Sequence, residues 1–146
     1  MKKSFLFISL LFFSLSSLAN SPVECIKKLT DAGHSYSGSR AFCQSNFNEE
    51  AISCAVTLVK SGHRHSESRA FCLSNSSHEA VSCAVRLVEA GHRHSVSRSF
   101  CKSQPSQAAI ECVIELVRAG GSYASARLFC QKYWPQTQFP ARNAVA

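Results

Sequence analysis

The sequence CAVTLVKSGHRHSESRAFC at residues 54–72 returns almost unchanged as CAVRLVEAGHRHSVSRSFC at residues 83–101. Two related stretches flank them, CIKKLTDAGHSYSGSRAFC at 25–43 and CVIELVRAGGSYASARLFC at 112–130, so one unit occurs four times with a period of 29 residues. Besides the two cysteines, a leucine, a glycine, an arginine and a phenylalanine occupy invariant positions in the unit. Self-similarity at a fixed period of this length is typical of repeat proteins, in which each unit packs on its neighbours.

Each unit has the pattern of two helices joined by a turn. The first helix opens on a residue whose side chain accepts hydrogen bonds from the first turn, namely Ser21, Asn48, Ser77 or Ser106. The invariant glycine ends this helix, because glycine enters the left-handed conformation without a steric clash. Apolar residues cover more than half of the first helix, which suits contact with both its hairpin partner and a neighbouring unit. The second helix is predicted to be about two turns long, with N-caps at Ser37, Ser66, Ser95 and, in the fourth unit, Ser122.

The eight cysteines are expected to form one disulfide within each unit. In an antiparallel helical hairpin the two cysteines lie nearly level, within the Cα separation of about 5.5–6 Å that a disulfide spans. The alternative joins adjacent units through Cys43–Cys54, Cys72–Cys83 and Cys101–Cys112, and leaves Cys25 and Cys130 at opposite ends. Repeat symmetry favours the first set, which is Cys25–Cys43, Cys54–Cys72, Cys83–Cys101 and Cys112–Cys130. The predicted fold is therefore an all-α solenoid of four disulfide-stapled hairpins.

The regions outside the repeats predict export and a cap. Residues 1–19 have a positive start, an apolar run and a small-x-small site, as a signal peptide does, whereas a membrane anchor needs a longer apolar run. We expect a secreted or periplasmic protein with no membrane span after cleavage, in a compartment where disulfides persist. The repeat domain is expected over residues 20–133, with units near 21–45, 48–74, 77–103 and 106–132. The tail 134–146 is expected to be partly disordered and to cap the last unit through Trp134, Phe139 and Pro140, together with Tyr133 at the end of the repeat domain.

The composition favours a binding protein over an enzyme. No Gly-rich phosphate loop, Gly-x-Ser-x-Gly elbow or His-Glu-x-x-His motif occurs in the 146 residues, and the predicted bridges leave no thiol nucleophile. The formal net charge of +7 falls to +5 when Lys2 and Lys3 leave with the predicted signal peptide, and this charge still predicts attraction to acidic surfaces or glycans. Nucleic acid is an unsuitable partner, because the basic groups are dispersed and the protein is expected to be exported. We therefore predict an interaction module for a partner protein, an acidic surface or a glycan.

The histidines after the invariant glycine suggest an alternative function. Imidazole is a favoured ligand of zinc, copper and nickel, and the stretch GHRHS occurs in two successive units. The candidate ligands of a divalent metal are His63, His65, His92 and His94. The other interpretation is that these side chains fill the turn and cap helix ends. No further cofactor is expected.

The invariant arginine also allows two interpretations. In the first, the arginines form a ladder that binds anions or an acidic partner, made of Arg40, Arg69, Arg98 and Arg127 with Arg64 and Arg93 from the loops. In the second, each arginine is structural and donates hydrogen bonds that tie one unit to the next. Its invariance beside core-type leucine and phenylalanine favours the structural interpretation.

Overall fold

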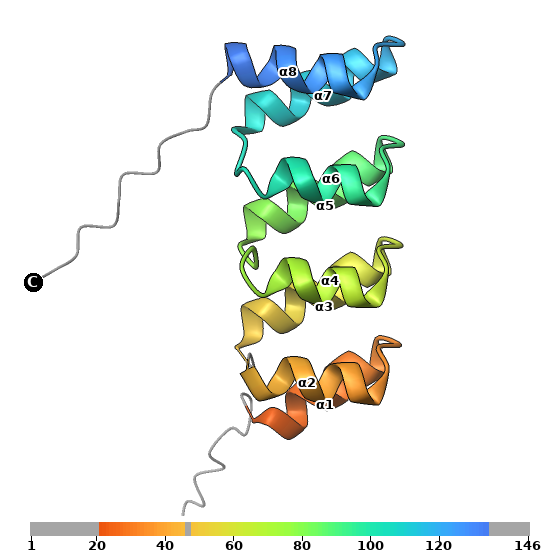
Figure 1. Ribbon diagram of the computed structural model, residues 1–146, viewed down its shortest axis with the longest axis vertical. Helices are drawn as coiled ribbons and strands as arrows, with labels where there is room; N and C mark the ends of the chain where they lie inside the picture. The colour runs from red at the N-terminus through yellow and green to blue at the C-terminus, as the bar shows by residue number, and fades with distance from the viewer. Residues whose placement is uncertain (1–20, 46–47, 135–146) are drawn as a thin grey trace, which may run out of the picture.

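The computed structural model describes residues 21–45 and 48–134, and all regular elements in these ranges are α-helices. The helices pair into four hairpins that stack in one column, with the first and last hairpins at opposite ends (Figure 1). This arrangement confirms the predicted all-α solenoid. In chain order the helices are α1 Pro22–Asp31, α2 Tyr36–Ser45, α3 Glu49–Lys60, α4 His65–Cys72, α5 His78–Glu89, α6 His94–Cys101, α7 Gln107–Arg118 and α8 Tyr123–Tyr133.

A disulfide joins the two helices of every hairpin, as the repeat symmetry predicted. The Cα–Cα separations are 5.8 or 5.9 Å, which places the paired cysteines level across each hairpin. The bridges are Cys25–Cys43, Cys54–Cys72, Cys83–Cys101 and Cys112–Cys130. No cysteine within the described ranges is free, so the pairing between adjacent units does not occur.

The ends of the first helices also follow the prediction. The side chains of Ser21, Asn48, Ser77 and Ser106 each accept a hydrogen bond from a backbone N–H of the first turn. The invariant glycines have φ between 88° and 93°. The residue after each glycine donates its N–H to a carbonyl five residues earlier, as His63 does to Leu58 at 3.0 Å. This closes the helix with a Schellman-type turn.

The second helices begin two residues earlier than predicted in the first three units. The helices α2, α4 and α6 begin at Tyr36, His65 and His94, so the predicted caps Ser37, Ser66 and Ser95 lie inside the first turn. The cap positions of α4 and α6 are held by Arg64 and Arg93, which make no side-chain capping bond. The second helices begin early because the turn after the glycine is tight, so that few residues separate the two helices of a hairpin. In the fourth unit Ser122 caps α8, as predicted.

The core is built from the repeated positions. The invariant leucine and phenylalanine are buried in the first three units, together with the disulfides. Small residues complete this core, and no pattern in the sequence predicted that they are buried. They are Ser39, Ser68, Ser97 and Ala126 in the second helices and Ala51, Ala80 and Ala109 in the first. The packed surface therefore runs continuously from unit to unit.

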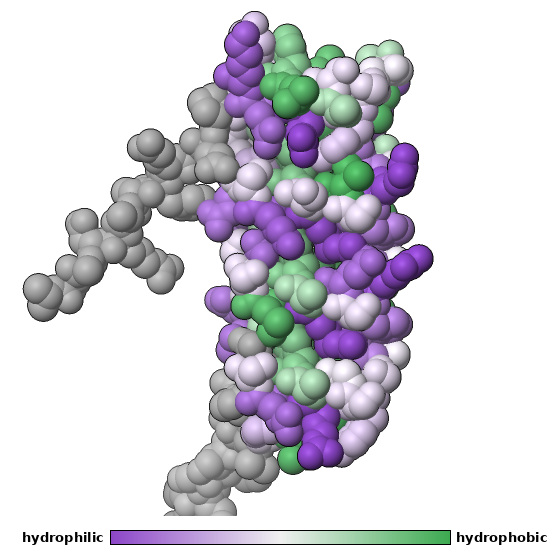
Figure 2. All heavy atoms as spheres, in the orientation of Figure 1, coloured by the Kyte–Doolittle hydropathy of each residue, from purple (hydrophilic) through white to green (hydrophobic). Residues whose placement is uncertain are grey.

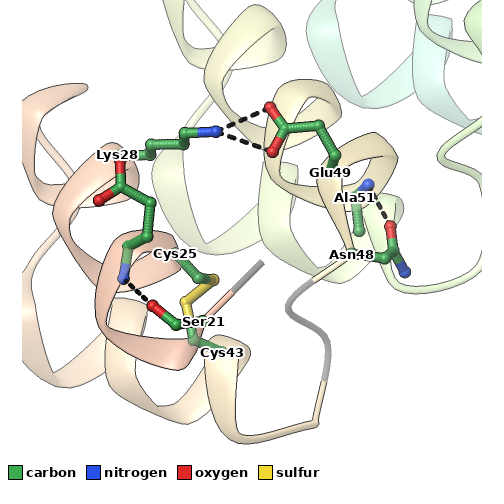
Figure 3. A network of polar contacts seen from close by, with 8 residues as sticks. Ser21, Cys25, Lys28, Cys43, Asn48, Glu49 and Ala51 are labelled. Carbon is green, nitrogen blue, oxygen red and sulfur yellow. Dashed lines mark hydrogen bonds and ion pairs between the residues drawn. A yellow bond between two sulfur atoms is a disulfide. The ribbon is translucent and has the colours of Figure 1, made fainter. Parts of the chain in front are cut away.

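Ion pairs on the outside also join neighbouring hairpins. The Lys28 ammonium lies 2.7 Å from a Glu49 carboxylate oxygen, which links α1 to α3 beside the first bridge (Figure 3). The Arg86 guanidinium lies 2.5 Å from Glu111 and links α5 to α7. Both pairs are partly exposed, so solvent and salt weaken them.

The surface carries both polar and apolar areas. On the face shown in Figure 2, hydrophobic residues form an interrupted band along the column, with hydrophilic residues on both sides. No helix within residues 21–45 and 48–134 is long and apolar enough to cross a membrane. The predicted signal peptide, residues 1–19, and the predicted capping residues Phe139 and Pro140 lie outside the described residues.

Candidate functional site

The first histidine after the glycine is a buried residue in the first three units. His34, His63 and His92 are all buried. Each follows the helix-ending glycine directly, and the glycine turn directs the side chain into the contact with the next unit. The hydrogen bond from its N–H to the invariant leucine carbonyl, 3.0 Å long in all three units, fixes this position.

The second histidine of each loop contacts the previous unit. The rings of His34 and His65 meet edge to face with 4.6 Å between centroids. His63 and His94 repeat this contact at 4.6 Å. The predicted metal ligands of one loop, His63 and His65, thus contact different neighbours. No group of three or more histidine, cysteine or acidic side chains within the described ranges is arranged to hold a metal ion, and the metal site stays a prediction.

The arginines complete these contacts between units. Arg69 Nη1 donates to His34 Nδ1 at 2.8 Å, and Arg98 Nη1 donates to His63 Nδ1 at 2.6 Å. A guanidinium carries only donors, so Nδ1 of both rings must be unprotonated. Each ring is therefore neutral, with its proton on Nε2.

The electrostatic surroundings keep the two buried rings neutral. Burial lowers the pKa of His34 to about 4, and the nearby charges of His65 and Arg69 act in the same direction. Burial likewise lowers the pKa of His63 to about 4, with further lowering from Arg98 and His94 and a smaller opposing effect of Glu67. Protonation would place an imidazole N–H against the guanidinium donor. The contact therefore exists only with the neutral ring.

One position of the second helix determines how each arginine is held. Arg98 forms an ion pair with Glu67 of the preceding unit, beside its hydrogen bond to His63. In the first unit Gly38 occupies the equivalent position, and a Cβ there would lie only 2.4 Å from Arg69 Nη2. The guanidinium of Arg69 therefore lies directly against the backbone of α2. Arg69 and Arg98 are therefore junction residues, and their acceptors are imidazoles of the preceding unit.

The third junction uses different chemistry. Tyr123 packs against His92 with 5.0 Å between ring centroids, and its hydroxyl donates to the Val96 carbonyl at 3.2 Å. Burial raises the pKa of Tyr123 and lowers that of His92. The Arg127 Nε is buried and has no hydrogen-bond partner among residues 21–45 and 48–134, and the residue in the position of Glu67 is Val96. This junction therefore lacks the ion pair found between the second and third units.

The remaining predicted anion ligands lie on the surface. Arg40 belongs to the first unit and is exposed, because no unit precedes it. Arg64 and Arg93 are exposed at the hairpin turns, which line one edge of the column (Figure 1). The four invariant arginines do not form one open ladder, since Arg69 and Arg98 are engaged inside junctions. Anion binding at Arg64 and Arg93 stays a prediction.

Two grooves lie beside the first helix of the third unit. One, of about 640 Å³, runs between α3 and α5; its apolar lining includes Val81 and Val85, and its charged lining includes Glu50 and Arg86. The other, of about 580 Å³, lies between α5 and the α6–α7 connection and is lined in part by Gln104 and Ile110. His78 and Ser82 border both grooves. No sequence pattern predicted these grooves, because they arise from how the hairpins stack.

Comparison with known proteins identifies no relative: the chain matches no protein-family model, no curated protein and no solved structure.

Proposed function

We propose that this chain is an exported binding module that holds a segment of a partner protein in the groove between α3 and α5. The groove itself is the observation that supports the proposal: at about 640 Å³ it combines apolar and charged lining across a junction between units. Solenoids use such continuous faces for binding, because every unit presents equivalent residues at the same place. The four disulfides are consistent with an oxidising compartment.

The lining defines the chemistry of the partner. Val85 is partly exposed and offers apolar contact, whereas Val81 is already buried in the floor of the groove. Burial of one aliphatic side chain of the partner contributes about 1.5–3 kcal/mol. Glu49 is engaged by Lys28 and Arg86 by Glu111, whereas Glu50 has no ion pair in the described part of the chain. A segment with an apolar side chain beside a lysine or arginine fits this lining, since the cation would pair with Glu50.

Selection from a random peptide display library on the oxidised protein tests this function. The selected peptides should be enriched in apolar residues next to a basic residue. Their affinity should fall at least about tenfold for Val85→Arg and for Glu50→Lys, which is about 1.4 kcal/mol. Leu73→Arg is the matched control, because Leu73 is exposed in the same array but does not line the groove.

Binding that is insensitive to both groove variants would contradict the proposed role of the groove. Peptides that bind wild type, Val85→Arg and Glu50→Lys with one affinity would place recognition elsewhere. If those peptides are acidic and lose affinity for Arg64→Glu and Arg93→Glu, the turn edge is the binding surface and the partner is the predicted acidic one.

A further inference from the structure

Each residue at an end of the array has equivalents in the inner units, so its exposure can be compared directly with theirs. Val23 of the first unit is 75% exposed, whereas its equivalents Ile52, Val81 and Ile110 are 2%, 8% and 4% exposed. These equivalents lie on the side of a unit that faces the preceding unit. The first unit therefore presents an apolar surface that every other unit buries. We call this side of the first unit the front face.

Other junction residues on the front face are also uncovered. Tyr36 is 65% exposed, and its equivalents His65, His94 and Tyr123 pack against the preceding histidine. Arg40 is exposed, and its equivalents Arg69 and Arg98 donate to that histidine. The front face thus carries the same three kinds of side chain that form the internal junctions.

The opposite end shows the complementary pattern. Phe129 is 48% exposed, whereas the phenylalanines at the same position in the first three units are at most 4% exposed. Leu116 and Cys112 are only partly buried, although their equivalents are fully buried. Tyr133 lies beside Phe129, with 4.6 Å between ring centroids, and is also exposed. We call this side of the fourth unit the back face.

We propose that a second copy of this chain covers the back face with its front face. At each of the three internal junctions, the side of one unit that corresponds to the back face packs on the side of the next unit that corresponds to the front face. The contact between copies therefore continues an interface that the chain already uses. The two faces lie at opposite ends of the column (Figure 1), and each copy can therefore bind one neighbour at each end. A contact between two different surfaces that does not close generates an open chain of copies.

The junction between copies lacks one component of the internal junctions. Gly121 stands where the first three units have the buried histidine, so Arg40 of the next copy finds no imidazole. The third internal junction already forms without a partner for Arg127 Nε. The apolar contact of Val23 and Tyr36 with Phe129 and Leu116 carries the association, which should be reversible and depend on concentration.

Sedimentation equilibrium of the oxidised chain after removal of the predicted signal peptide, residues 1–19, over a range of concentrations tests the proposal. The average mass of wild type should rise with concentration beyond that of a dimer. Val23→Glu blocks the front face and Phe129→Glu blocks the back face, so each variant alone should remain a monomer. An equimolar mixture should form a dimer and stop there, because only one productive pair of faces remains. Leu73→Glu, exposed in the middle of the array, should associate like wild type.

A second back-face variant keeps the proposal testable if Phe129→Glu fails to fold. Tyr133→Glu changes an exposed residue at the end of α8 and should behave like Phe129→Glu in the mixture, with a wild-type circular dichroism spectrum. If Val23→Glu associates normally while Phe129→Glu does not, two back faces meet and the proposal is wrong. Wild type that is monomeric at every concentration also overturns it. Association gained by Phe139→Ser would then identify residues 135–146 as the occupant.

Discussion

At the scale of single residues, the most consequential feature is a buried histidine that accepts a hydrogen bond from an arginine. His34 and His63 have a folded-state pKa of about 4, below the value of 6.5 expected for the unfolded chain. Between these two pH values the unfolded chain binds a proton that the folded chain does not. The free energy of unfolding is therefore highest above pH 6.5 and falls as the pH decreases toward 4.

The pH dependence gives a direct test of this contact. Each ring should remove about 1–3 kcal/mol from the free energy of unfolding across this range. Urea titrations at a series of pH values between 6.5 and 5, where most carboxylates stay charged, measure the effect. His63→Gln keeps an acceptor for Arg98 but cannot titrate, so its stability should change less with pH. If the free energy of unfolding of His63→Gln and of wild type depends on pH in the same way, protonation of His63 does not destabilise the fold, and the proposed role of the neutral ring is wrong.

The invariant arginine should contribute differently in different junctions. Arg98→Ala leaves both His63 and Glu67 without their donor. Glu67 reaches solvent and His63 is neutral, so the loss is that of hydrogen bonds to a charged group, about 2–3 kcal/mol. Arg127→Ala is the matched control, because its Nε has no partner, and it should cost about 1 kcal/mol. Urea midpoints with unchanged slopes give both values. Equal losses would mean that the arginine acts only through packing.

The hydrogen bonds of the buried rings bear directly on the predicted metal site. In His63 the Nδ1 lone pair faces Arg98 and Nε2 carries the proton, so a metal would have to break the junction. We expect zinc, copper and nickel to leave the melting temperature unchanged, whereas a metal bound to the folded state would raise it with concentration. A nanomolar affinity that disappears in the His65→Ala, His94→Ala double variant would instead establish the metal site.

At the scale of the element, the invariant phenylalanine stabilises a unit to an extent that depends on whether another unit covers it. Phe100 is buried by the following unit, whereas Phe129 has no following unit and is half exposed. Phe100→Ala should cost about 3–5 kcal/mol, from lost burial and the cavity left behind. Phe129→Ala should cost less than half as much, because the ring already contacts solvent. Denaturant titrations of the two variants make the comparison, and equal costs would mean that the back face is covered.

At the scale of the whole molecule, the period of 29 residues predicted most of the fold. The equal spacing of the cysteines determined the bridges, and the glycines determined where the first helices end. The burial of His34, His63 and His92 was missed, because a histidine after a glycine resembles a loop residue. One signal in the sequence pointed to it: among the four repeats, the last one has Gly121 at this position, and within the described residues it has no following repeat that could bond a ring there. The grooves depend on the stacking geometry, which no spacing in the sequence encodes.

The unequal junctions predict how the column opens. In a solenoid each unit is stabilised mainly by its nearest neighbours, so regions with weaker junctions open first. The first two junctions contain the arginine–histidine bond, while the third has the Tyr123 hydroxyl and leaves Arg127 Nε without a partner. Amide hydrogens of α7 and α8 should therefore exchange fastest, those of α1 and α2 next, and those of α3 to α6 most slowly. Hydrogen exchange with mass spectrometry of the oxidised protein measures this order. Slowest exchange in α7 and α8 would show that the last hairpin is held by something other than its internal junction.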